Sequence, residues 1–272
     1  MAGGYGEDTM QYVCAACTHV FHEFRLACPE CGGWRTISAG ALACAPGVNA
    51  PVPLPGISVA HVVRVAAGEE SVDRVLGGGF VPGSSLLLAG PPGAGKSTLL
   101  LQLLDSMRLP ALYVSGEESV QQLKLRADRL MINAPYISLL FETHVENILE
   151  QLKSNPAGVL VLDSIQTVQT GTSAAIPGSP TQMRRCTYLL RREAQDRNVV
   201  LIIVGQVNKQ NRAAGPKLIE HALDVLLYLE ADEQDPQRRI LSTSKNRFGS
   251  TVPCCFMTMG ERGFVFHRKG VA

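Results

Sequence analysis

A glycine-rich segment ends in a lysine and a serine at residues 90–97, which read Gly-Pro-Pro-Gly-Ala-Gly-Lys-Ser. This is the G-x-x-x-x-G-K-[ST] pattern of a phosphate-binding loop. Glycines let the backbone turn its N–H groups towards phosphate oxygens, and a helix beginning near Lys96 adds the positive end of its dipole. We expect Lys96 to reach the β- and γ-phosphates of ATP, and Ser97 to ligate Mg²⁺. The predicted nucleotide-binding residues are Gly90, Pro91, Pro92, Gly93, Ala94, Gly95, Lys96, Ser97 and Thr98.

Acidic residues stand where two apolar runs end. The run 159–163 reads Val-Leu-Val-Leu-Asp, so a buried strand would deliver Asp163 to the edge where open α/β sheets bind ligands. We expect Asp163 to lie next to Mg²⁺ and to act through bound water. Glu117 and Glu118 follow the run 111–115, and one of them is a candidate general base. Adjacent side chains point in different directions, so we expect only one of the two to face the γ-phosphate, and we favour Glu117 slightly. The alternative is that both acids only complement the dipole of the next helix.

Four cysteines near the N-terminus form two C-x2-C pairs with ten residues between them. Each pair sets two thiolates at the spacing of a tetrahedral zinc site. A segment of about 26 residues cannot build a core unaided, so we expect the zinc to be structural and to drive folding. His19 and His22 are alternative ligands, although four cysteines already fill the site, and redox chemistry is the other alternative. The predicted zinc ligands are Cys14, Cys17, Cys28 and Cys31.

Alternating apolar and amphipathic stretches from about Val62 to Phe266 predict βαβ units and a mostly parallel sheet. The phosphate loop then lies between a strand and a helix, which argues against a glycine-rich turn without function. Later strands follow one another closely, which favours an antiparallel extension of the sheet. Strands are expected at 85–89, 111–115, 137–141, 159–163, 199–204, 224–230, 239–245, 252–259 and 263–267. Helices are expected from the phosphate loop to 107 and at 119–130, 145–154 and 182–196.

Composition and length bound the organisation of the chain. Its 272 residues are 46% hydrophobic and 18% charged, which suits one α/β domain and a small module. We expect a zinc-binding module at 11–36, a proline-rich linker at 37–61 and an ATPase domain at 62–272. The net charge of +1 leaves a nucleic-acid site to local basic patches. No apolar run is long enough for a transmembrane helix and no signal peptide begins the chain, so we expect a cytoplasmic protein without membrane contact.

Several motifs together resemble the bacterial RadA/Sms family of RecA-like DNA repair ATPases. The most specific is Lys-Asn-Arg-Phe-Gly at 245–249, and the similarity covers roughly residues 11–267. The other carrying segments are the cysteine pairs with Gly32-Gly33-Trp34, 73–79, 90–97, 113–119, 162–167, 214–217 and Glu220-His221. The resemblance implies a RecA-type P-loop NTPase fold with a small N-terminal zinc-ribbon module.

The resemblance also implies partners and further site residues. The family forms a hexameric ring with ATP sites between subunits, binds single-stranded DNA and branch-migrates recombination intermediates. By this resemblance, Lys245 and Arg247 would reach the ATP of a neighbouring subunit, stabilise transition-state charge and couple DNA binding to nucleotide state. Alternatively, these two residues are only the basic end of an ordinary strand. A recombinase partner, recognised by the zinc module, is implied by the family resemblance alone.

Two segments, 171–181 and 207–217, match the DNA-binding loops of RecA-like proteins. Basic side chains in the second loop suit phosphates, and two arginines open the helix after the first. For those arginines, a solvated helix face is an equal alternative. The predicted DNA-binding residues are Arg184, Arg185, Lys209, Arg212 and Lys217.

The chain departs from the family pattern in two places. The family continues into a domain resembling the Lon protease, whereas this sequence ends at Ala272, so we expect that domain to be absent. Gln206 stands where the family has histidine, and we expect it still to sense the γ-phosphate. Two other functions stay open: a nucleotide-gated DNA-binding protein with little turnover, and a RecA-fold ATPase that acts on protein.

Overall fold

The computed structural model describes residues 11–14, 20–21, 28–31, 37–40, 54, 63–172, 175–206 and 218–267. These residues fall into two compact units, Met1–Val59 and Ala60–Ala272.

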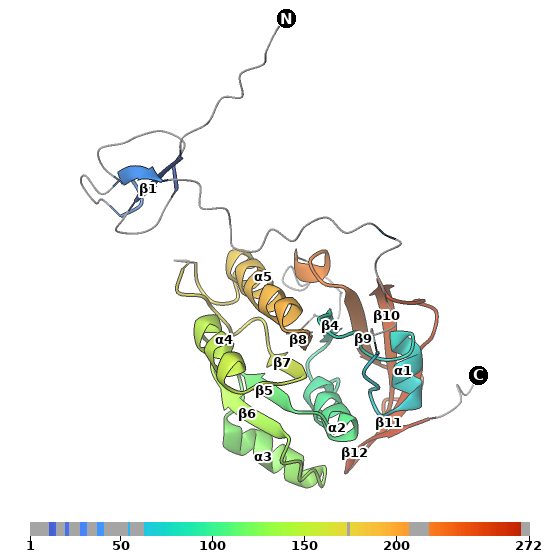
Figure 1. Ribbon diagram of the computed structural model, residues 1–272. Helices are drawn as coiled ribbons and strands as arrows, with labels where there is room; N and C mark the ends of the chain where they lie inside the picture. Colours follow the sequence, from blue (N-terminus) through green and yellow to red (C-terminus); the bar gives the residue numbers. More distant parts are fainter. Residues whose placement is uncertain are drawn as a thin grey trace, which may run out of the picture. The chain divides into compact units, whose positions relative to one another are not determined.

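The larger unit is built on a nine-stranded sheet in the order β12-β11-β10-β9-β4-β8-β7-β5-β6 (Figure 1). The six strands from β9 to β6 run parallel, and β10, β11 and β12 add an antiparallel edge. The strands are β4 (Ser85–Gly90), β5 (Ala111–Ser115), β6 (Ile137–Phe141), β7 (Val159–Asp163), β8 (Val200–Gln206), β9 (Val225–Ala231), β10 (Arg238–Asn246), β11 (Cys255–Gly260) and β12 (Gly263–Phe266).

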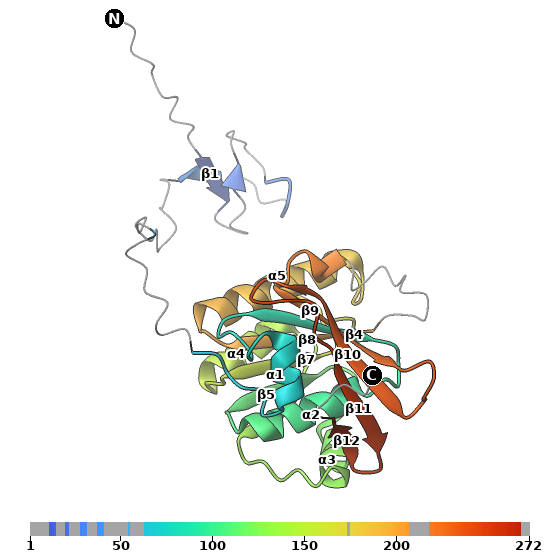
Figure 2. The same cartoon turned by 90° about the vertical axis from the view of Figure 1, so that its right-hand side faces the viewer.

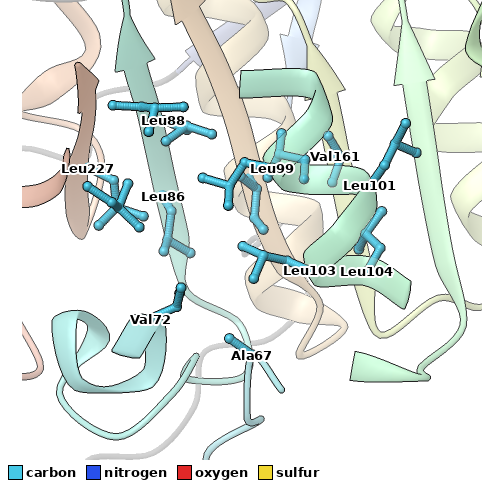
Figure 3. Close-up of a cluster of buried hydrophobic side chains, with 14 of the residues drawn as sticks. Ala67, Val72, Leu86, Leu88, Leu99, Leu101, Leu103, Leu104, Val161 and Leu227 are labelled. Atoms are coloured by element: carbon cyan, nitrogen blue, oxygen red, sulfur yellow. The ribbon is translucent and has the colours of Figure 1, made fainter. Parts of the chain in front are cut away.

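Five helices cover the two faces of this sheet. They are α1 (Glu70–Leu76), α2 (Lys96–Met107), α3 (Val120–Arg129), α4 (Val145–Ser154) and α5 (Pro180–Asp196). Alternate residues of β4 show the two faces: Leu86 and Leu88 pack with α1, α2 and α3, whereas Leu87 and Ala89 pack with α4 and α5. Figure 3 shows the first cluster, in which leucines of α2 lie against β4. Burial on both faces explains why the central strands are continuous apolar runs.

The predicted helices and strands are confirmed to within a few residues, with two differences. The first of the late strands, β9, is parallel to β4 rather than part of the antiparallel extension. Its connection from β8 spans residues 207–224, which is long enough for a crossover between parallel strands. Helix α1 was not predicted, because its seven residues are too few for a clear helical pattern; it packs beside β10 and β11 (Figure 2).

The smaller unit contains a three-stranded antiparallel sheet in the order β2-β1-β3. Its strands are β1 (Gln11–Cys14), β2 (Val20–Phe21) and β3 (Ile37–Gly40). Because β3 pairs with β1 along four residues, the expected linker at 37–61 begins too early, and the module extends at least to Gly40. Of the helices in the described parts of both units, none has the length and apolar character needed to cross a membrane.

Candidate functional site

The glycine-rich loop joins β4 to α2 and brings its lysine inside the fold. Gly93 and Gly95 have φ values of 77° and 101°, which side-chain-bearing residues rarely adopt. A Cβ on Gly90 would lie 2.3 Å from the backbone oxygen of Leu229, so only glycine fits there without a shift. Lys96 is 7% exposed, and its Nζ donates hydrogen bonds to the carbonyls of Gly90 and Pro91, both at 2.9 Å.

The charge of Lys96 is set by two opposing influences. Burial lowers the pKa of its ammonium group, whereas the carboxylates of Asp163 and Glu117 act to raise it. Lys96, Asp163 and Glu117 all line one cavity. An anionic phosphate placed there would favour the charged ammonium further.

Ser97 and Asp163 meet at the expected magnesium position. The Ser97 hydroxyl donates to Oδ2 of Asp163 at 2.6 Å, and Tyr113 donates to the same oxygen at 2.6 Å. A hydroxyl beside a carboxylate offers the hard oxygen ligands that Mg²⁺ prefers, so these residues fit the ion. Tyr113 is fully buried, and burial followed by the charge of Asp163 raises the pKa of its phenol well above the usual value. Sequence reasoning missed Tyr113; the one signal was a polar-tipped residue within a buried aliphatic strand.

The two adjacent glutamates have different surroundings. Glu117 accepts a 2.5 Å hydrogen bond from Ser164, and the Gln206 amide lies 3.1 and 3.2 Å from its two carboxylate oxygens. Glu118 instead pairs with Arg126 of α3. Both glutamates line the same cavity, but Glu117 contacts the strand-end residues Ser164 and Gln206, whereas Glu118 is paired with α3.

One cavity of about 470 Å³ joins these groups. It opens at the carboxyl ends of the parallel strands, where Gly90 is paired with Gln206 and Ser115 with Asp163. Arg126, Arg129 and the β11–β12 hairpin also line it, and none of these was predicted to be part of the site. The lining residues are Pro92, Gly93, Gly95, Lys96, Ser97, Thr98, Glu117, Glu118, Arg126, Arg129, Asp163, Gln206, Met259, Gly260 and Glu261.

Lys245 and Arg247 lie at the opposite edge of the sheet from this cavity. Arg247 contacts Asp224, which in turn binds Ser85 at the start of β4. The phosphate loop begins at Gly90, five residues further along β4, which corresponds to about 16 Å of strand. The structure therefore does not bring Lys245 and Arg247 to the nucleotide cavity of their own chain.

Two of the five predicted DNA-binding residues lie in the described part of the chain. Arg184 and Arg185 are exposed on α5. The buried Gln182 beside them ties the helix to the preceding loop, because its amide contacts Thr170 and donates to the carbonyl of Ala175 at 2.8 Å. Lys209, Arg212 and Lys217 lie outside the described residues.

Three of the four predicted zinc ligands lie together. The sulfur atoms of Cys14, Cys28 and Cys31 are all within 4.8 Å of one another, and those of Cys14 and Cys31 are 3.7 Å apart. A tetrahedral site with Zn–S bonds of about 2.3 Å requires S···S distances of about 3.8 Å, so these cysteines fit the ion. Cys17 lies outside the described residues, as do both histidines considered as alternatives.

The fold and the site define a P-loop nucleotide-binding protein of the RecA-like type. Residues 56–212, more than half of the chain, match the family described as AAA domain, and the chain belongs to that family. It is 40% identical over 268 residues to the DNA repair protein RadA of Bacillus subtilis, which confirms the resemblance stated from the motifs. The match takes in 93% of this chain and 58% of the relative, so the chain spans little more than half of that protein's length.

Solved structures confirm the fold class. The KaiC-like protein PH0186 of Pyrococcus horikoshii is 21% identical with a TM-score of 0.64, and the match covers 76% of this chain and 99% of that one. The RadB recombinase is 24% identical with a TM-score of 0.58, and the match covers 74% and 98%. At these identities the likeness concerns the fold alone.

Proposed function

We propose that this chain is a DNA-dependent ATPase of homologous recombination and DNA repair, which processes or branch-migrates recombination intermediates. The observation that carries the ATPase part is the joint placement of Lys96, Ser97, Asp163 and Glu117 around one cavity. The DNA part is supported by the name of the bacterial relatives, DNA repair protein RadA.

In the proposed reaction, the backbone of the phosphate loop and Lys96 bind the β- and γ-phosphates. Mg²⁺, when held beside Ser97 and Asp163, neutralises charge that develops on the phosphates. Glu117 accepts a proton from a water molecule whose oxygen forms a bond to the γ-phosphorus. The bond between that phosphorus and the β–γ bridging oxygen breaks, and ADP keeps the electron pair. Until the γ-phosphate enters the cavity, the Gln206 amide orients the Glu117 carboxylate.

Lys245 and Arg247 act in this proposal on the nucleotide of a second copy of the chain. Their distance from the cavity of their own chain supports such an arrangement. Repeated around a closed ring, it gives ATP sites shared between neighbouring copies, and the family resemblance implies that the ring is a hexamer. Cations that approach the γ-phosphate from a neighbour stabilise transition-state charge.

The proposed DNA surface comprises the two arginines at the start of α5, together with Lys209, Arg212 and Lys217. It takes single strands and branched intermediates, mainly through phosphate contacts. A structural zinc ion in the N-terminal module, a recombinase partner for that module and a cytoplasmic location complete the proposal.

Fluorescence anisotropy of a labelled single strand tests the DNA function, in the presence of no nucleotide, ADP or ATP. Replacing Arg184 and Arg185 together by Ala should weaken binding and reduce the slope of log affinity against log salt by about two. Arg192→Ala removes an exposed arginine of the same helix and should leave the slope unchanged. Binding to no DNA in any nucleotide state would overturn the DNA function and favour an ATPase that acts on protein. DNA binding without measurable turnover would support the nucleotide-gated binding protein instead.

A further inference from the structure

Asp224 lies at the sheet edge opposite the nucleotide cavity, directly before β9, and only 8% of it is exposed. Its two carboxylate oxygens have separate partners. Oδ2 accepts hydrogen bonds from the backbone N–H of Ser85 at 3.0 Å and from the Ser85 hydroxyl at 2.6 Å. Oδ1 accepts a 3.0 Å hydrogen bond from Arg247 and lies 3.9 Å from a guanidinium nitrogen of Arg191. One oxygen therefore anchors the side chain to β4, and the other faces cations.

The segment 220–224, which ends at Asp224, also holds Lys245. Its Nζ donates to the backbone carbonyls of Glu220 at 3.0 Å and Leu223 at 2.6 Å, and the Arg247 N–H donates to the carbonyl of Asp224 at 3.1 Å. Burial, followed by repulsion from Arg247, lowers the pKa of the Lys245 ammonium group. A phosphate group near this pair of cations would relieve that repulsion.

Asp224 and one of its partners, Arg191, each follow a candidate DNA segment in the chain. Arg191 belongs to α5, the helix after residues 171–181. Residues 218–224 come directly after the segment 207–217 in the chain. Through Oδ1 of Asp224, α5 and the segment 218–224 thus share a contact with Arg247, and the backbone carbonyl of Asp224 adds a second contact from that segment.

We propose that Asp224 is a positioning residue, which holds Arg247 and, through the segment 220–224, Lys245 in the orientation that reaches the nucleotide of a second copy of this chain. The inference rests on the proposed function, in which those two cations act between copies. Anchoring β9 to β4 requires only Oδ2. The pair between Oδ1 and Arg247 adds little stability, because half of the Arg247 side chain is exposed.

Asp224→Asn separates these two tasks. The amide oxygen of the variant still accepts from both Ser85 donors, while its NH2 group turns towards the arginines and cannot pair with them. The full chain is assayed for ATP turnover with and without saturating single-stranded DNA, for affinity towards a fluorescent ATP analogue and for thermal unfolding. We expect kcat to fall at least about tenfold, part of the ~10³–10⁵ that an arginine finger supplies, with nucleotide affinity and melting temperature unchanged.

Asp232→Asn is the matched control. The Asp232 carboxylate is 14% exposed and pairs with Arg238 at 3.4 Å at the other end of β9, so its loss should leave kcat unchanged. Mixing Asp224→Asn chains with Lys96→Ala chains provides a second readout. The Lys96→Ala chains have an intact Asp224 and can present Arg247 to the intact phosphate loops of the other variant, so the mixture should hydrolyse ATP several-fold faster than either variant alone.

Wild-type kcat in Asp224→Asn would overturn the inference. A loss of kcat that is accompanied by lost nucleotide binding, or that mixing does not reverse, would also overturn it, because the residue would then be only structural. The proposed function is tested separately on the wild-type chain: ATP turnover that DNA does not stimulate would contradict that function. The turnover of the two chains without DNA would still decide the role of Asp224.

Discussion

Gln206 places its side-chain amide against both carboxylate oxygens of Glu117, at 3.1 and 3.2 Å. Gln206 is the last residue of β8, and the candidate DNA segment 207–217 follows it directly. A γ-phosphate that enters the cavity would compete with Glu117 for this amide. We propose that loss of this contact communicates the nucleotide state to the segment beyond β8.

The different surroundings of Glu117 and Glu118 predict opposite outcomes for two neighbouring substitutions. Glu117→Gln keeps the shape of the side chain but cannot take a proton, so turnover should fall about 10²–10⁴-fold. Glu118→Gln breaks only a partly exposed pair with Arg126 and should keep turnover within a few-fold. Steady-state hydrolysis, measured beside equal nucleotide affinities, checks both variants. The reverse pattern would make Glu118 the base.

Gly90→Ala should destabilise the larger unit. Its new Cβ would lie 2.3 Å from the backbone oxygen of Leu229, and neither central strand can move away without losing its pairing. We expect a loss of about 1–3 kcal/mol in the free energy of unfolding, measured by urea denaturation. Gly158→Ala is the control, because its Cβ would meet nothing closer than 3.7 Å. Equal unfolding midpoints for the two variants would contradict this close approach.

The cysteine cluster predicts about one zinc ion per chain, measured by elemental analysis. Cys28→Ser should abolish zinc binding and make the first 60 residues sensitive to protease, because so small a unit depends on its metal. The larger unit has its own apolar clusters and should melt at an unchanged temperature. Cys254→Ser, at an exposed position of the larger unit, should keep the zinc. Wild-type protein without zinc would contradict the assignment.

The sequence predicted those parts of the site that lie within a few residues of one another or at strand ends. Lys96 and Ser97 belong to one local motif, and Asp163 ends an apolar run that is typical of a buried strand. Tyr113 and Arg126 were missed because their roles depend on which strand and helix lie beside the motif. Local pattern carries no such information. Likewise, the parallel direction of β9 depends on how a long connection crosses the sheet, which residue spacing does not specify.

Whether this chain is a DNA-dependent ATPase can be measured as steady-state ATP hydrolysis by the wild-type chain, titrated with single-stranded DNA beside a Lys96→Ala control. We expect turnover to rise severalfold with DNA and to be lost in the control, because in the proposed function Lys96 holds the phosphates. Turnover that DNA leaves unchanged, or that persists without Lys96, would contradict a DNA-dependent ATPase at this site.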